Sequence, residues 1–268
     1  MELNQKLTTT EFDTNIPSGK QDPSLADPTN YQRLIGRLLY LTTTRPDISF
    51  TVQCLSQFMH SPKKSHMDAA LRLVRYLKSA LGMGILMSSH GGNELKVFCD
   101  VDWGACINSR RSITGYLVQY GGSPISWKSK KQTTVSRSSA ESEYRSMAST
   151  ISELVWIIAL YKELGEEIQL PVKLFCDSKA ALHIAANPVY HERTKHIEID
   201  CHFIREKLQQ GFIKVNYLPT REQPADVLTK GLSKLQHEHL LSKLGVLNIF
   251  APPSLKGSVE IQEDVRGC

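Results

Sequence analysis

The spacing of hydrophobic and polar positions changes near residue 90 of the chain. Before it, apolar side chains such as Leu34, Leu38 and Leu41 recur every three or four positions, which predicts amphipathic helices. After it, short apolar runs rich in β-favouring residues alternate with turn residues, which predicts strands. A helical block is therefore expected to precede a region built on a β-sheet.

Strands and helices alternate in the predicted second region. Segments 85–88 and 95–99 are expected to pair as a hairpin around the glycine-rich turn at 91–93. The elements expected after it are strands at 112–120 and from 125, a long helix capped by Ser138 or Ser139, a strand at 172–177, helices at 178–187 and 191–210, a strand at 212–218, and a helix from 225 to about 245. This order is typical of a mixed sheet with helices on its faces.

The two ends of the chain have a different composition. Residues 1–27 are polar and contain prolines, and residues 246–268 combine prolines with an acidic stretch, so both are predicted to be tails. The remaining chain divides into a helical block at 28–90 and a sheet domain at 91–245.

Bulk composition narrows the class of protein. A chain of 268 residues that is 41% hydrophobic can build one large core or two small ones. The net charge of +5 favours a polyanionic partner without requiring one. Six cysteines without a Cys-x-x-Cys pair indicate reduced thiols rather than a zinc ribbon or a disulfide framework. No secretory signal and no membrane span are predicted, so we expect an intracellular protein.

Carboxylates gather at the predicted ends of strands and helices. Asp100 and Asp177 each follow the same dipeptide, Phe-Cys, at the end of an apolar run. Neighbouring strands lie roughly 4.7–4.9 Å apart, so these two carboxylates would repel each other without a proton or cation between them. Glu143 and Asp226 stand near predicted helix starts. Because Mg²⁺ prefers oxygen ligands, the pattern predicts a metal site, although each acid alone could simply cap a turn or a helix.

Ordered motifs run along residues 28–245. Those of the helical block are YQRLIGRLLYL from 31, TRPDI from 44, LSQFM from 55 and LVRYLK from 73. Those of the sheet domain are DVDW from 100, RRSITGY from 110, ISWKSKKQ from 125, SSAESEY from 138, TKHI from 194, HFIRE from 202 and QPADVLTK from 223. Together they resemble the C-terminal part of the Pol polyprotein of copia-type LTR retrotransposons, the first group being similar to the end of its reverse transcriptase and the second to its ribonuclease H domain.

This resemblance implies a ribonuclease H-like α/β fold, with a mixed five-stranded sheet flanked by helices. It also implies an enzyme that cuts the RNA strand of an RNA/DNA hybrid with two Mg²⁺ ions, or Mn²⁺ in their place. Asp100, Glu143, Asp177 and Asp226 match the family's four metal-binding acids. The helical block would be a remnant of the reverse transcriptase thumb or connection. The rest of the reverse transcriptase would be a partner, in a cytoplasmic particle or the nucleus.

Two of these assignments have a competitor. Asp102 competes with Asp100, which is preferred because it follows the apolar run as Asp177 does. Glu141 competes with Glu143, which is preferred because its neighbours fit the family's helix pattern better. The histidine that such enzymes often carry before the fourth acid is missing from 217–223, which leaves proton delivery to water or Glu222.

Basic residues concentrate around the second and third strands of the sheet domain. They are candidates for phosphate contacts, with a solvated charged surface as the alternative. The candidates are Arg110, Arg111, Lys128, Lys130, Lys131 and Arg137. A Tyr-x-Asp-Asp motif is absent, so DNA polymerisation is not expected. A non-catalytic nucleic-acid-binding or docking module and a nuclease for duplex DNA are the competing hypotheses.

Overall fold

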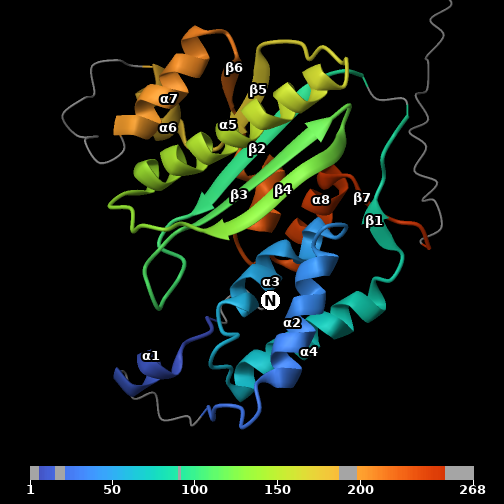
Figure 1. Ribbon diagram of the computed structural model, residues 1–268, viewed down its shortest axis with the longest axis vertical. Coiled ribbons are helices and arrows are strands. Elements are labelled where there is room, and N and C mark those ends of the chain that lie inside the picture. The colour runs from blue at the N-terminus through green and yellow to red at the C-terminus, as the bar shows by residue number, and fades with distance from the viewer. Residues whose placement is uncertain (1–5, 16–21, 90–91, 187–197, 251–268) are drawn as a thin grey trace, which may run out of the picture.

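A helical block lies beside a β-sheet in the computed structural model, which describes residues 6–15, 22–89, 92–186 and 198–250 (Figure 1). The block begins with α1 (Thr10–Asn15) and α2 (Thr29–Leu41). It continues through the 3₁₀ turn Pro46–Ile48 to α3 (Ser49–Ser56) and α4 (Lys64–Ser79). Pro46 stands at the first position of its turn, where its missing N–H costs no helical hydrogen bond.

Apolar faces of α2, α3 and α4 form the core of the block. Tyr31, Ile35 and Leu55 are fully buried there, and the Tyr31 hydroxyl donates a hydrogen bond of 2.8 Å to the carbonyl oxygen of Leu55. A buried ion pair lies in the segment between α2 and α3, with Arg45 Nη2 2.7 Å from Asp47 Oδ2. The three-to-four spacing in the sequence therefore does correspond to buried helix faces.

The N-terminal residues are more structured than a polar tail. Leu7 is buried in the core of the block, and the Lys63 ammonium forms ion pairs with Asp13 and Asp22. The prediction of a tail over 1–27 is wrong for the part that is described, because a single apolar anchor and a buried lysine tie it down. Residues 1–5 and 16–21 lie outside the described residues.

A five-stranded mixed sheet, in the order β4-β3-β2-β5-β6, forms the centre of the second region. Its strands are β2 (Leu95–Asp102), β3 (Ile113–Tyr120), β4 (Ser123–Lys131), β5 (Val172–Cys176) and β6 (Ile213–Tyr217). The first three strands are antiparallel, whereas β5 runs parallel to both β2 and β6. The predicted mixed five-stranded sheet is confirmed.

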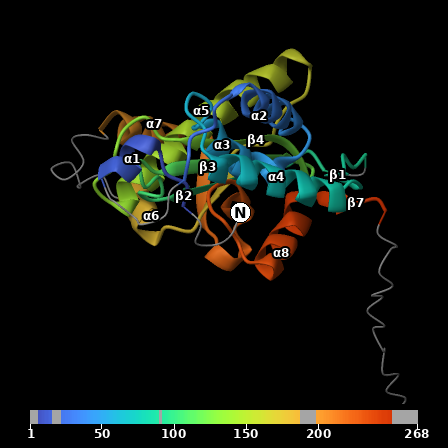
Figure 2. The same cartoon turned by 90° about the horizontal axis from the view of Figure 1, so that it is seen from below.

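Helices cover both faces of this sheet. The helices described after the β3–β4 hairpin are α5 (Ser139–Glu163), α6 (Lys179–Ala186), α7 (Glu198–Gln209), the 3₁₀ helices η3 (Thr220–Glu222) and η4 (Pro224–Leu228), and α8 (Lys234–Leu244). Val97 packs in one core with residues of α5 and α7, while its neighbour Phe98 contacts the core formed by η4 and α8. Figure 2 shows α5 and α8 on opposite sides of the sheet. Of the helix expected over 191–210, residues 198–209 form α7, and residues 191–197 lie outside the described residues.

The predicted hairpin before residue 100 does not form. β1 (Met83–Ile85) pairs with β7 (Val246–Asn248) in a separate two-stranded sheet. Gly245 adopts a left-handed conformation (φ 77°) that ends α8 and turns the chain toward β1. Alternation predicts a strand but not its partner, and the prediction of a tail is wrong for residues 246–248, which form β7. Residues 251–268 lie outside the described residues.

The expected helix from 225 to 245 is two helices. η4 ends at Leu228, and α8 begins after Ser233, whose hydroxyl accepts a hydrogen bond from the Gln236 N–H. The five cysteines in the described part are free thiols, and no helix of that part is long and apolar enough to cross a membrane.

Candidate metal centre

Asp100 and Asp177 are carried to the same place by two parallel strands. Phe98 of β2 is in register with Phe175 of β5, and each aspartate comes two residues later. Unlike Asp177, Asp100 does not follow its strand, because β2 continues to Asp102 and pairs with β3 throughout. The two aspartates are therefore equivalent in the pairing of β2 with β5, but only Asp177 lies beyond the end of its strand. Asp100 is 1% exposed and points into the protein rather than into solvent.

Glu143 reaches the same region from the first turns of α5. Ser138 caps this helix by accepting a hydrogen bond from the Glu141 N–H. Tyr144 and Met147 anchor the helix in the core, and Glu143 itself is buried. The helix start therefore holds a carboxylate against the end of β5.

Asp226 approaches from the opposite face of the sheet, in η4. The Gln223 side chain fixes this element by donating a hydrogen bond of 3.0 Å to the carbonyl oxygen of Cys99. Gly115, which pairs with Asp100 in the sheet, makes room for it. A methyl group on Gly115 would lie 2.7 Å from Thr229 Cγ2 and 2.8 Å from Leu228 Cβ. The glycine thus allows the element carrying Asp226 to pack against the strand beside Asp100.

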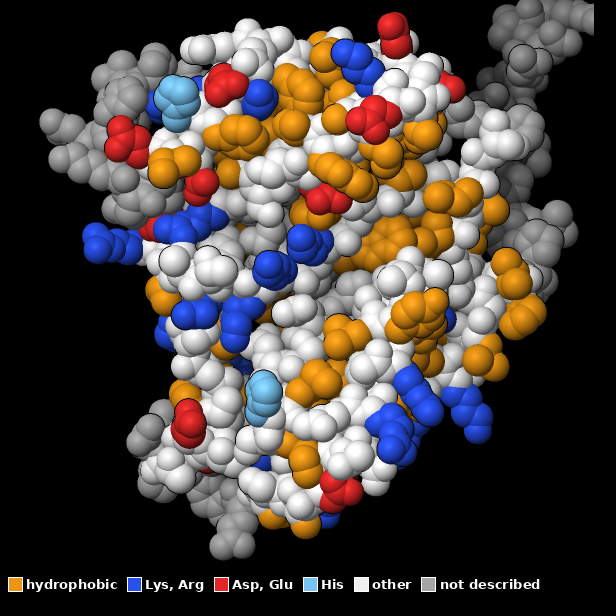
Figure 3. Space-filling view, viewed as in Figure 1, with side chains coloured by type: hydrophobic (Ala, Val, Ile, Leu, Met, Phe, Trp, Pro, Cys, Tyr) orange, Lys and Arg blue, Asp and Glu red, His pale blue; other side chains and the backbone are white. Residues whose placement is uncertain are grey.

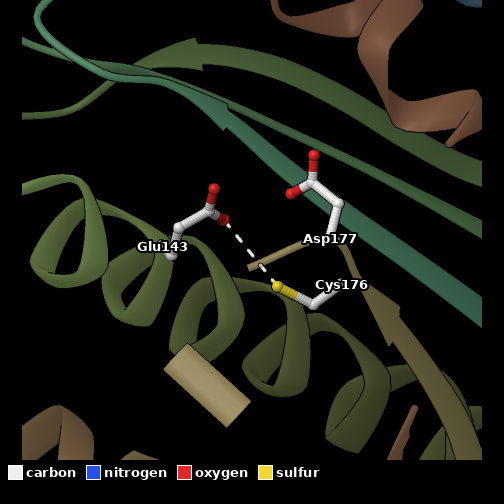
Figure 4. A group of neighbouring side chains, drawn as sticks. All are labelled: Glu143, Cys176 and Asp177. Atoms are coloured by element: carbon white, nitrogen blue, oxygen red, sulfur yellow. Dashed lines mark hydrogen bonds between the residues drawn. The ribbon is translucent and has the colours of Figure 1, made fainter. Parts of the chain in front are cut away.

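The four acids meet in two overlapping groups. One carboxylate oxygen from each of Asp100, Asp177 and Asp226 lies within 4.8 Å of the others. The same limit holds for Glu143, the Cys176 thiol and Asp177. Figure 4 shows Glu143 extending from α5 toward Cys176 and Asp177 at the end of β5. Asp177 belongs to both groups, so all four predicted acids share one site.

Burial makes this concentration of negative charge costly. Desolvation, reinforced by Cys176 and Asp100, raises the pKa of Glu143 to about 10. Desolvation and the nearby Asp100 raise the pKa of Asp226 to about 8, and burial also raises the pKa of Asp177. Carboxylates in this state favour either a proton or a cation nearby.

A lysine supplies one positive charge to the cluster. Lys230 Nζ lies 3.0 Å from Asp226 Oδ1 and 3.4 Å from Asp100 Oδ2. The preceding Thr229 hydroxyl donates a very short hydrogen bond to the same Asp100 oxygen. Burial lowers the pKa of Lys230, but Asp100 and Asp226 outweigh it and the net shift is upward.

These residues fit a hard divalent cation. The set Asp100, Asp177 and Asp226 offers only oxygen ligands, as Mg²⁺ and Mn²⁺ prefer, and Glu143 adds another carboxylate beside Asp177. The cluster already attracts the ammonium of Lys230. The four carboxylates of the cluster therefore have a single nearby cation, the Lys230 ammonium, among the described residues.

Comparison with the sequences of known proteins identifies relatives of this chain. The chain is 46% identical over 230 residues to the retrovirus-related Pol polyprotein from transposon RE1 of Arabidopsis thaliana, an alignment that covers 86% of this chain and 16% of that polyprotein. It is 44% identical over 237 residues to the corresponding polyprotein from transposon RE2 of the same plant, covering 88% and 16%. The chain belongs to the retrovirus-related Pol polyproteins of transposons. It spans about a sixth of the length of these relatives.

Other comparisons add little to the family assignment. No protein-family model matches the chain. Among solved structures, this Pol-family chain is similar to the ribonuclease H1 LC11 isolated from compost, with a TM-score of 0.41 and 15% identity. That likeness covers 52% of this chain and 94% of the other, and it concerns the fold alone.

The competing acids of this Pol-family chain have other partners. Glu141 Oε2 accepts a hydrogen bond of 2.7 Å from the Arg137 N–H, and Glu141 Oε1 lies 2.8 Å from Arg145 Nη2. Asp102 lies outside both acid groups and lines a small neighbouring cavity. The structure thus brings Asp100 and Glu143 into the cluster rather than their competitors.

Residues with no acidic signal complete the site, and sequence reasoning missed them. They are Gly115, Gln223, Thr229 and Lys230. Gln223, Thr229 and Lys230 stand in the same motif as Asp226, so the spacing of that motif was the available signal. Gly115 gave a weaker signal, as a lone glycine inside a predicted strand, which often marks a close backbone approach.

The loop before Asp226 directs Glu222 away from the acid cluster. Glu222 is 3.5 Å from His239 Nε2 and also pairs with Lys243, both on α8. Thr220 instead reaches the site, donating a hydrogen bond of 2.8 Å to Asp177 Oδ2. Of the two alternatives for proton delivery in place of the missing histidine, water and Glu222, these contacts favour water.

The basic candidates divide into two sets. Arg110, Arg111, Lys128, Lys130 and Arg137 are exposed, whereas Lys131 is half-buried and donates a hydrogen bond of 2.6 Å to Gln57 Oε1. Figure 3 shows Lys and Arg side chains gathered on the left of the visible face, at the level of the sheet. Lys131 therefore connects β4 to the residue that caps the C-terminal end of α3, and the other five are exposed to a ligand.

Proposed function

We propose that the chain is a Mg²⁺-dependent endonuclease that hydrolyses the RNA strand of RNA/DNA hybrids, as part of a retrotransposon Pol polyprotein. The proposal rests on one observation above all. Four acids from β2, α5, the end of β5 and η4 converge in a largely buried cluster, and the pKa values of Glu143, Asp177 and Asp226 in it are raised. The relationship to Pol polyproteins supports the reaction class.

In this proposal, each side chain has a separate role. Asp100, Asp177 and Asp226 would hold one ion, while Glu143 and the shared Asp177 would hold the second. Two bound ions would supply the positive charge that activates water and stabilises the leaving oxygen of a phosphodiester. Thr220 orients Asp177 through its hydrogen bond.

The exposed basic residues are proposed to hold the hybrid. Five of them would contact phosphates directly: Arg110, Arg111, Lys128, Lys130 and Arg137. Lys131 would contribute to hybrid binding indirectly, through its hydrogen bond to Gln57. Such contacts suit an enzyme that acts on hybrids of any sequence, because phosphates carry no base information. The helical block at 28–90 would face the remaining reverse transcriptase of the parent polyprotein, in a cytoplasmic particle or the nucleus.

Substrate choice tests this function. We expect the chain with Mg²⁺ to cut labelled RNA within a hybrid. It should cut neither single-stranded RNA of the same sequence nor the matching DNA duplex. A preference for duplex DNA would instead favour a DNA nuclease on the same fold. Hybrid binding without turnover in Mg²⁺ or Mn²⁺ would favour a non-catalytic binding module.

A further inference from the structure

The ammonium of Lys230 occupies a position among the acids that the proposed reaction does not use. Its Nζ bridges two carboxylates that come from separate elements, Asp226 of η4 and Asp100 of β2. Both partners are at most 4% exposed, whereas the lysine side chain is 29% exposed. One end of the lysine is therefore held by buried acids while the rest of it reaches the surface.

The same side chain has space into which it can withdraw. Lys230 lines a cavity of about 600 Å³ between the helical block and α8. Glu238 of α8 also lines this cavity, so a carboxylate outside the metal cluster is present there, whereas Asp47 on the opposite wall is already paired with Arg45. A lysine has four rotatable stem bonds, which let its ammonium move without a change in the backbone.

We propose that Lys230 is a built-in counter-ion that neutralises the acid cluster when no divalent cation is bound and is displaced into the cavity when one binds. This inference rests on the proposed metal site. Two cations cannot both neutralise Asp100 and Asp226 at contact distance without repelling each other. Lys230 is thus a positioning residue that keeps the acids together for the incoming ion.

The competition has two opposite consequences. Without Mg²⁺, loss of the ammonium leaves Asp100, Asp177 and Asp226 mutually repulsive, so the metal-free protein becomes less stable. When Mg²⁺ binds to a protein that lacks the Lys230 ammonium, the ion does not have to displace a tethered positive charge, so the affinity of the site for Mg²⁺ rises. Coupling between two ligands at one site is reciprocal, and a roughly tenfold gain in Mg²⁺ affinity is expected when the lysine charge is removed.

The test compares Lys230→Gln with Lys230→Arg and a matched control, Lys234→Gln. Lys234 lines the same cavity four residues further along the chain, at the start of α8, is 86% exposed and is 3.9 Å from Glu238 rather than from the cluster. We would titrate each full chain with Mg²⁺ by calorimetry and measure its melting temperature with and without the ion.

Lys230→Gln is expected to lower the metal-free melting temperature by roughly 2–4 °C and to bind Mg²⁺ more tightly, whereas Lys230→Arg and Lys234→Gln keep both values near those of the parent chain. Unchanged or weaker Mg²⁺ binding by a folded Lys230→Gln chain would overturn the inference. If no variant binds Mg²⁺, the proposed metal site itself fails. If Mg²⁺ binds equally well to all variants, only the counter-ion role fails.

Discussion

Replacing Asp100 with asparagine is expected to slow hydrolysis of the hybrid by roughly 100- to 1,000-fold, the range found when one preorganised electrostatic group is removed from an active site. Asp100 faces Asp177 and Asp226 within 4.8 Å and accepts the short hydrogen bond from Thr229. Asparagine keeps the size of the side chain but removes the negative charge that a divalent cation needs. Single-turnover cleavage of labelled hybrid measures the loss.

Asp102→Asn is the matched control for this substitution. Asp102 lies two residues further along the same strand, is partly buried and belongs to neither acid group. Its loss should change the cleavage rate by less than about tenfold, because it alters the local potential without removing a ligand. An equal loss in both variants, with both chains folded by circular dichroism, would contradict the assignment of Asp100.

Gly115→Ala is expected to reduce cleavage as strongly, although the residue carries no functional group. The added methyl would meet Thr229 and Leu228 at less than 3.0 Å, and the backbone of η4 would have to move away from β3. Overpacking of this kind costs about 1–3 kcal/mol of stability, and a shift of a catalytic group by about 1 Å can cost about 10²-fold in rate. Urea unfolding and hybrid cleavage would be measured on the same preparation.

Gly84→Ala provides the comparison for that variant. Gly84 also lies in a strand, β1, but a methyl group there has nothing within 4 Å. Its stability should stay within about 1 kcal/mol of the parent chain and its cleavage rate should be unchanged. If Gly115→Ala cleaves the hybrid at the parental rate, the close packing of η4 against β3 does not position Asp226.

The acids of the site were predictable because their sequence signal is local. Phe-Cys-Asp appears twice at strand positions, and parallel neighbouring strands bring Asp100 and Asp177 together. The long helix and its Ser138 cap follow from periodicity and from a preferred capping residue. Both signals depend on residues a few positions apart, which a sequence displays directly.

The parts that escaped prediction depend on distant contacts. Lys230 gains its role only because η4 packs against β2. Asp226 is 126 positions and Lys230 is 130 positions after Asp100 in the chain. The pairing of β1 with β7 joins segments far apart in the described chain, and Leu7 is buried by helices that follow it. A hydrophobic pattern predicts that a segment will be buried, but it does not identify the partner that buries it.

Cleavage of an RNA/DNA hybrid by the full chain and by its Asp177→Asn variant, side by side in Mg²⁺, is the most direct test of the proposed reaction. Asp177 is the acid common to both groups of the cluster, so its charge is required for either ion. We predict that the parent chain cuts the RNA strand, that a chelator stops it, and that Asp177→Asn is inactive while still folded. Absence of RNA cleavage by the parent chain, or equal cleavage by Asp177→Asn, would contradict the proposed function.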